Sequence, residues 1–183
     1  MSKSHRVPKR LKQRPQFRGL PIPYIALIKP DGQPDFRVTD EAKRRSVMLN
    51  RFCQLCGEPL GRWFFFTGGP DCAKANMYFE PAAHLDCLIY AMQVCPFIVG
   101  RIEHADTDKI VADNPGLRVK VDSNFATERN PLWIIKKAIA YSYARTPDGT
   151  IMLVPTVVKE TGPLEPETMK PQDWQRVMED LMR

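Results

Sequence analysis

Apolar positions divide this chain into short segments that are separated by proline and glycine turns. A brief run at 24–28, Tyr-Ile-Ala-Leu-Ile, precedes the turn sequence Lys-Pro-Asp-Gly and predicts one short strand. Residues 60–67 contain the unbroken run Trp-Phe-Phe-Phe, which predicts a buried strand. The following Gly-Gly-Pro-Asp sequence, residues 68–71, predicts a turn, and residues 77–79 predict the strand that returns from it.

Two further segments have the signals of amphipathic helices. Thr39 is a suitable N-cap, and the two acids after it suit the first turn, so we expect a helix from there to about Asn50. Near the end of the chain, Pro171 suits the first turn of a short helix. Its apolar residues recur at helical spacing and predict one buried face, formed by Trp174, Val177, Met178 and Leu181.

A third helix is predicted over residues 81–95. Pro81 suits its first turn, and Pro96 would end it. The segment is apolar almost all round. Its polar residues Asp86 and Gln93 are seven positions apart, so they share one face, which we expect to be the solvent stripe.

The C-terminal third contains a strong hairpin signal. The turn sequence Thr-Pro-Asp-Gly at 146–149 separates segments 132–146 and 150–158, and Tyr141 and Tyr143 alternate with Ser142 as in a half-buried strand. Residues 133–137 could be strand or helix. Residues 101–130 are polar and acid-rich, and predict a loop region with a turn at Asn-Pro-Gly and one strand at 117–121.

Together these elements predict the α+β class. We expect a basic, disordered tail at 1–20, a zinc-binding domain at 21–100 with its core at 53–95, a polar loop region at 101–130, and a β-hairpin plus C-terminal helix at 131–183 packed on the same body.

The charge of the chain is concentrated at its beginning. The whole sequence of 183 residues has 27 basic and 21 acidic residues, a net charge of +6, but residues 1–20 hold seven basic residues and no acid. The remainder therefore has 20 basic against 21 acidic residues. A basic tail can bind phosphate backbones without sequence preference, or it can simply keep the protein soluble. The candidate nucleic-acid residues are Lys9, Arg10, Lys12, Arg14 and Arg18 in the tail and Lys43, Arg44 and Arg45 on the helix before residue 53.

Nothing in the sequence indicates export or membrane insertion. The basic N-terminus has no apolar segment typical of a signal peptide, and the longest apolar stretch, 85–99, is too short and too interrupted to span a bilayer. Five cysteines are an odd number, so disulfides cannot use them all. We therefore expect a reducing compartment, the bacterial cytosol or a phage-infected cell, and metal ligation.

The strongest chemical signal is a pair of cysteine motifs. Cys53 and Cys56 form a CxxCG motif with Gly57, and His84 and Cys87 form an HxxC motif. The first spacing lets one tight turn present two sulfurs, and the second places two ligands on one helix face. Three thiolates and an imidazole suit one structural Zn²⁺.

The other two cysteines are expected to lie outside the site. Cys95 is eight residues beyond Cys87, roughly 12 Å along a continuous helix, and is interpreted as a small buried hydrophobe. Cys72 lies near the expected hairpin tip, although it is the best replacement if His84 is not a ligand. In the alternative interpretation, all five cysteines are ordinary core residues.

The order of these segments resembles a treble-clef zinc finger. In that family a CxxCG knuckle is followed by a β-hairpin and then by a helix whose first turn supplies two more ligands. Here the knuckle would be 53–57, the hairpin roughly 60–79, and the helix ligands His84 and Cys87. The resemblance covers 53–95 and implies no activity. The chain also looks similar to small zinc-binding proteins of bacteria and their phages.

Nucleases of the HNH class share this finger shape, but their hallmark is missing here. Those enzymes place a general-base His at the end of the hairpin, beside groups that hold a catalytic metal. The corresponding segment, 78–84, has His84 as its only histidine, and that residue is already assigned to zinc; Glu80 alone is no catalytic constellation. We therefore expect no catalytic residues.

Three functions follow from the sequence. The first is a non-enzymatic, zinc-stabilised module that contacts nucleic acid through its tail and basic helix. The second is a protein-interaction or assembly factor of a phage or mobile element. The third is a divergent HNH nuclease. We expect neither a membrane partner nor a small-molecule substrate.

Overall fold

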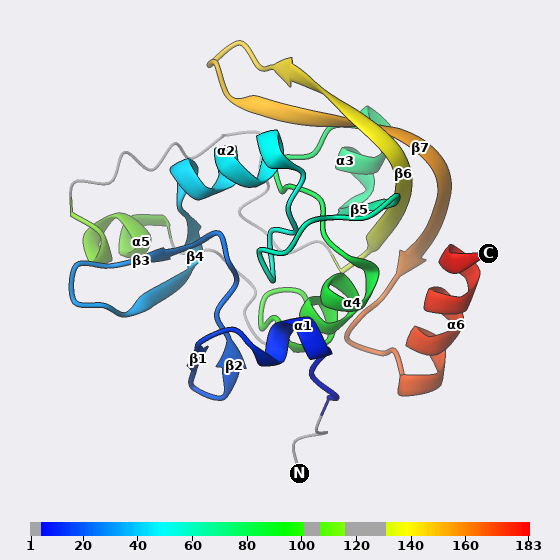
Figure 1. The fold of residues 1–183 in the computed structure, drawn as a ribbon, viewed down its shortest axis with the longest axis horizontal. Coiled ribbons are helices and arrows are strands. Elements are labelled where there is room, and N and C mark those ends of the chain that lie inside the picture. Colours follow the sequence, from blue (N-terminus) through cyan, green and yellow to red (C-terminus); the bar gives the residue numbers. More distant parts are fainter. Residues whose placement is uncertain (1–4, 101–106, 116–130) are drawn as a thin grey trace.

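The protein has the predicted α+β class, with both helices and antiparallel sheets (Figure 1). The structure, a computed structural model, describes residues 5–100, 107–115 and 131–183. In chain order the elements are α1 (Lys9–Lys12), β1 (Gln16–Phe17), β2 (Leu20–Pro21), β3 (Ala26–Ile28), β4 (Pro34–Thr39), α2 (Glu41–Asn50), β5 (Phe64–Gly68), α3 (Pro70–Ala75), α4 (Leu85–Val94), α5 (Thr107–Asp113), β6 (Trp133–Arg145), β7 (Ile151–Leu164) and α6 (Pro171–Met182).

The predicted C-terminal hairpin is confirmed as the long, curved ribbon of β6 and β7 (Figure 1). Its turn closes through two backbone hydrogen bonds, from Gly149 N to Thr146 O (2.8 Å) and from Thr146 N to Thr150 O (3.0 Å). Residues 133–137, which the sequence left open between strand and helix, belong to β6. The ribbon forms a three-stranded antiparallel sheet of order β5-β6-β7.

The predicted partner of β5 was wrong. β5 pairs with β6, from Phe64 opposite Ala138 to Gly68 opposite Ile134, and not with residues 77–79. The expected turn instead begins the short helix α3, with Pro70 at its start, and Tyr78 pairs with Leu153 of β7. A strand buried on both faces needs cover on each side, which a two-stranded hairpin alone does not provide.

Successive residues of the sheet point alternately into two hydrophobic clusters, one on each face. Phe65 and Ile135 point to one cluster, where α4 and α6 lie, whereas Phe64 and Phe66 point to the other, which includes Tyr78. The predicted amphipathic helix α6 is confirmed, with Trp174, Val177 and Leu181 buried and Met178 partly buried in the first cluster.

Two helix starts differ from the predictions. The N-cap of α2 is Asp40, whose Oδ1 accepts from Lys43 N at 3.0 Å, and not Thr39, which belongs to β4. Helix α4 begins at Leu85 and not at Pro81, because Ala83 is extended and pairs with Phe65. No helix in the described ranges is long and apolar enough to cross a membrane.

Two segments that the sequence predicts to be irregular contain structure. Within the expected tail, residues 9–12 form α1, and β1 pairs with β2. The reason is Leu11, which is only 3% exposed and packs in the first cluster. Within the expected loop region, residues 107–113 form α5. The predicted strand at 117–121 lies outside the described residues.

Candidate metal centre

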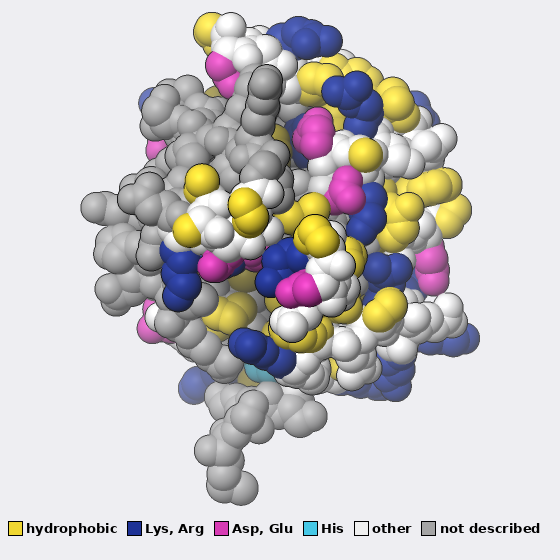
Figure 2. All heavy atoms as spheres, turned by 90° about the vertical axis from the view of Figure 1, so that its left-hand side faces the viewer, with side chains coloured by type: hydrophobic (Ala, Val, Ile, Leu, Met, Phe, Trp, Pro, Cys, Tyr) yellow, Lys and Arg dark blue, Asp and Glu magenta, His cyan; other side chains and the backbone are white. Residues whose placement is uncertain are grey.

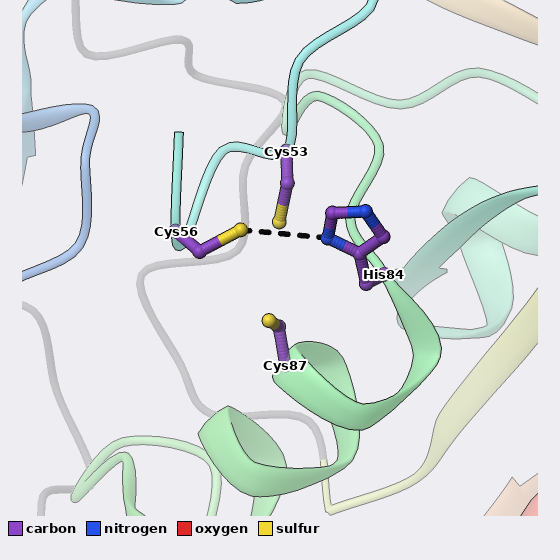
Figure 3. Close-up of side chains that lie close together, drawn as sticks. All are labelled: Cys53, Cys56, His84 and Cys87. Atoms are coloured by element: carbon purple, nitrogen blue, oxygen red, sulfur yellow. Dashed lines mark hydrogen bonds between the residues drawn. The ribbon is translucent and has the colours of Figure 1, made fainter. Parts of the chain in front are cut away.

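The four residues of the two cysteine motifs come together in space (Figure 3). The sulfur atoms of Cys53, Cys56 and Cys87 and a ring nitrogen of His84 all lie within 4.8 Å of one another. The three cysteines are buried, and the imidazole is partly buried. This is a group of side chains that could hold one metal ion.

The first pair of sulfurs is presented by a tight loop at 53–57. Cys53 N donates to Glu58 O and Gly57 N donates to Cys53 O, each at 2.8 Å, which closes the loop. Gly57 has φ +81°, and a Cβ at this position would lie 2.5 Å from the Tyr24 ring. The loop therefore requires glycine for both its backbone conformation and its packing.

The second pair lies at the start of α4. His84 is the residue before the helix, and its carbonyl accepts from Leu88 N at 2.9 Å, while Cys87 is in the first turn. The expected three-residue spacing thus places both groups on one side, although the helix begins later than predicted (Figure 3). A helix N-terminus also favours a thiolate there.

A hydrogen bond at the ring nitrogen that points away from the sulfurs orients the imidazole of His84. Its Nε2 lies 3.1 Å from the carbonyl oxygen of Pro59, so Nε2 carries the hydrogen and Nδ1 faces the sulfurs, 3.4 Å from Cys56 Sγ. Burial lowers the pKa of His84, but the Cys56 sulfur outweighs it, so the pKa is raised. The pocket therefore favours positive charge at this point.

Two of the three thiols, those of Cys53 and Cys87, have strongly shifted pKa values. Burial raises the pKa of Cys53, but the hydrogen bonds to its sulfur, led by those with Cys56 and Cys87, together outweigh burial and lower the pKa to about 3. The pKa of Cys87 is raised far above its ordinary value by its hydrogen bonds to Cys53 and Cys56 and by burial. The cluster therefore favours a thiolate at Cys53 and opposes a second one at Cys87. A bound divalent cation would stabilise both thiolates.

Cys72 and Cys95 lie outside this cluster. Cys72 is on α3, half-buried, and burial raises the pKa of its thiol. Cys95 is the residue that follows α4 and is also partly buried. His84, and not Cys72, completes the group of four.

Among the candidate nucleic-acid residues, Arg44 has a different role. Its side chain is 1% exposed, and it donates to Phe79 O through Nε (3.0 Å) and to Ile151 O through Nη2 (2.5 Å). It also pairs with Glu41 at 3.2 Å. Arg44 joins α2 to two distant segments, so its guanidinium is unavailable to a nucleic acid, contrary to the sequence-based expectation.

The other candidates do not form one patch. Arg10 is paired with Glu58 and Asp86, Arg14 donates to Ile22 O, and Lys43 donates to Ala26 O. On the face shown in Figure 2, basic and acidic side chains of the described residues are mixed. Five candidates are exposed: Lys9, Arg10, Lys12 and Arg18 near the N-terminus and Arg45 on α2.

Arg10 contacts residues beside the candidate metal centre, a relationship that the sequence alone did not indicate. Its carboxylate partners, Glu58 and Asp86, lie within two residues of predicted ligands. Burial lowers the pKa of Arg10, but these carboxylates and, more weakly, the Cys87 and Cys56 sulfurs outweigh it and raise the pKa. The signal in the sequence was a lone leucine, Leu11, in a strongly basic segment.

Comparisons with known protein families, with curated proteins and with solved structures found no match to this chain. The function must therefore be inferred from its own residues and their geometry.

Proposed function

We propose that Cys53, Cys56, His84 and Cys87 bind one structural Zn²⁺. The observation that carries this proposal is the 4.8 Å cluster of three thiols and one oriented imidazole. A tetrahedral zinc with Zn–S bonds of about 2.3 Å would separate its sulfur ligands by about 3.8 Å. Only a small contraction around the ion is therefore needed. Soft sulfur ligands favour zinc over magnesium or calcium.

The proposed ion stabilises the fold and is not catalytic. Four protein ligands fill a tetrahedral shell, whereas a catalytic zinc keeps one position for water. We propose a treble-clef-like arrangement in which the knuckle at 53–57 and the start of α4 hold the ion. The hairpin between them is reduced to one bridge, between Phe65 and Ala83, because β5 extends its pairing to β6 instead.

We propose further that the zinc-stabilised body is a nucleic-acid-binding module. Support comes from the seven basic residues at 1–20 and from the exposure of Lys9 and Lys12 on α1, which have no carboxylate partner among the described residues. Such cations bind phosphates through release of counterions, without reading sequence. A protein-interaction or assembly role remains the second candidate, favoured by exposed apolar residues such as Leu49 on α2 (67% exposed).

Binding of a fluorescent duplex DNA and a fluorescent RNA, measured by anisotropy over a range of salt concentrations, tests the nucleic-acid role. The double variant Lys9→Gln with Lys12→Gln should lower the salt dependence of binding by about 1.8 in log–log slope on duplex DNA.

The matched control replaces Lys74, on α3, and Arg145, the last residue of β6, with glutamine. Both are exposed, and Figure 1 shows α3 and the turn between β6 and β7 away from α1. Equal effects of the two double variants, or no binding by either nucleic acid, would contradict this role. Metal-dependent cleavage of a plasmid would favour a nuclease instead.

A further inference from the structure

The N-terminal segment lies across both halves of the candidate metal centre. Arg10 Nε is 3.1 Å from Glu58 Oε2, and Arg10 Nη1 is 3.3 Å from Asp86 Oδ2. Glu58 follows the knuckle loop, and Asp86 lies in α4 between the two proposed ligands of that helix. A single guanidinium therefore connects the two segments that must stay together to hold an ion.

Two further contacts hold the same segment in place. Leu11 is 3% exposed and belongs to the hydrophobic cluster that contains Cys53 and Cys87. His5 Nδ1 is 2.8 Å from Gln93 Oε1, on α4. The polar face of α4, predicted to be a solvent stripe, is thus partly covered by residues 5–12, which we name the N-terminal strap.

The two kinds of contact differ in strength. The ion pairs of Arg10 are about two-fifths exposed, so solvent and salt weaken them. Burial of Leu11 is insensitive to salt and contributes more. Arg10 adds charge compensation, because three thiolates, one neutral imidazole and one Zn²⁺ sum to a net charge of −1.

We propose that the N-terminal strap is a non-ligating part of the metal centre that slows release of the ion, with Arg10 and Leu11 as its positioning residues. This inference depends on the proposed zinc site. The strap holds the knuckle against the start of α4, so that an ion can leave only after the strap has lifted. Lys9 and Lys12 are carried on the same helix, so their position depends on the loaded metal centre.

The test measures the rate at which the full-length, zinc-loaded protein transfers zinc to an excess of a chromogenic chelator, with the zinc content measured beforehand. Arg10→Gln should keep one zinc per chain and release it about fivefold faster than the unmodified protein. Leu11→Ala should release it faster still, by about tenfold or more.

Lys12→Gln is the matched control. It removes one positive charge from the same helix, and Lys12 has no ion-pair partner among the described residues. Its release rate should equal that of the unmodified protein. Arg10→Lys should release zinc more slowly than Arg10→Gln but faster than the unmodified protein. High salt should raise the release rate of the unmodified protein towards that of Arg10→Gln and should leave the rate of Arg10→Gln unchanged.

The outcomes separate the strap from the zinc site. If the unmodified protein contains no zinc, the proposed site fails. If it contains one zinc, and Arg10→Gln and Leu11→Ala release zinc at the same rate as Lys12→Gln, the proposed role of the strap is contradicted and the zinc site is not. Hydrogen exchange should show faster exchange at residues 5–12 in Arg10→Gln while residues near Leu153 are unchanged; uniform acceleration over the chain would contradict the strap as well.

Discussion

His84 and Cys56 face each other across the candidate metal centre, with Nδ1 of the imidazole 3.4 Å from Sγ of the cysteine. The two residues are 28 positions apart and belong to different segments, the start of α4 and the knuckle loop. The contact therefore joins the two halves of the cluster, and a bound ion would convert it into a cross-link of the chain.

Removing one sulfur from the cluster should cause both loss of the metal and unfolding. We expect Cys56→Ser to lose zinc and to unfold at least residues 53–95, because the binding free energy of a structural zinc is also folding free energy. Metal content and circular dichroism check this. Cys95→Ala is the control; it should keep zinc and lose about 1 kcal/mol of unfolding free energy. Full zinc content in Cys56→Ser, or metal loss in Cys95→Ala, would show that the ligands are misassigned.

Arg44 should matter for stability and not for binding. Arg44→Met removes the buried hydrogen bonds that Arg44 donates to the carbonyl oxygens of Phe79 and Ile151, so we expect the free energy of unfolding to fall by about 3 kcal/mol. The neighbouring Arg45 is exposed, and Arg45→Met should change stability by less than about 0.5 kcal/mol. Urea unfolding of both variants decides the matter; equal losses would mean that the buried hydrogen bonds of Arg44 contribute little.

Gly57 should tolerate no side chain. Gly57→Ala combines an unfavourable φ of +81° with a contact of 2.5 Å to the Tyr24 ring, and we expect a loss of at least about 2 kcal/mol. Gly149 has a similar φ of +86° but nothing within 4 Å, so Gly149→Ala isolates the backbone contribution of about 1 kcal/mol. Thermal or urea unfolding measures both. If the two substitutions cost the same, the packing against Tyr24 is unimportant.

Lowering the pH should reduce the free energy of unfolding, partly through protonation of Asp35. This buried carboxylate accepts two hydrogen bonds from the Arg37 guanidinium, at 2.9 and 2.6 Å, one from the backbone N of Arg37, at 3.0 Å, and one from Asn114 Nδ2, at 3.0 Å. The Arg37 guanidinium, more than any other group, holds the pKa of Asp35 well below its ordinary value. A carboxyl with a lowered folded-state pKa contributes stability above its unfolded pKa, about 3.9, and loses it as the pH falls towards the folded value.

The stability difference between the unmodified protein and Asp35→Asn should therefore be complete at neutral pH and should shrink below about pH 4. Urea unfolding at a series of pH values measures it. A difference that stays constant down to about pH 2 would show that the ion pair is not its source.

The four residues of the cluster could be predicted from the sequence because their geometry is local. Cys53 and Cys56 share one turn, and His84 and Cys87 are separated by less than one helical turn, so spacing alone indicates which side chains can meet. The β6–β7 hairpin was predictable for the same reason, since the residues at 146–149 determine the turn.

The partner of β5 could not be predicted, because Phe64 and its neighbours are apolar on both faces. Such a strand has no preferred side, and its partner, β6, begins about 65 residues later in the sequence. Arg44 is one of three consecutive basic residues, and only the distant carbonyls of Phe79 and Ile151 distinguish it. The burial of Leu11 could not be predicted from composition. The basic residues of 1–20 dominate the composition of that segment, whereas a single buried side chain holds it in place.

X-ray absorption spectroscopy at the zinc edge, on protein purified without added metal, tests the central claim most directly. The account predicts one zinc per chain with a four-coordinate shell of three sulfurs at about 2.3 Å and one nitrogen at about 2.0–2.1 Å. Protein that contains no zinc, or a shell with oxygen ligands and fewer than three sulfurs, would contradict it.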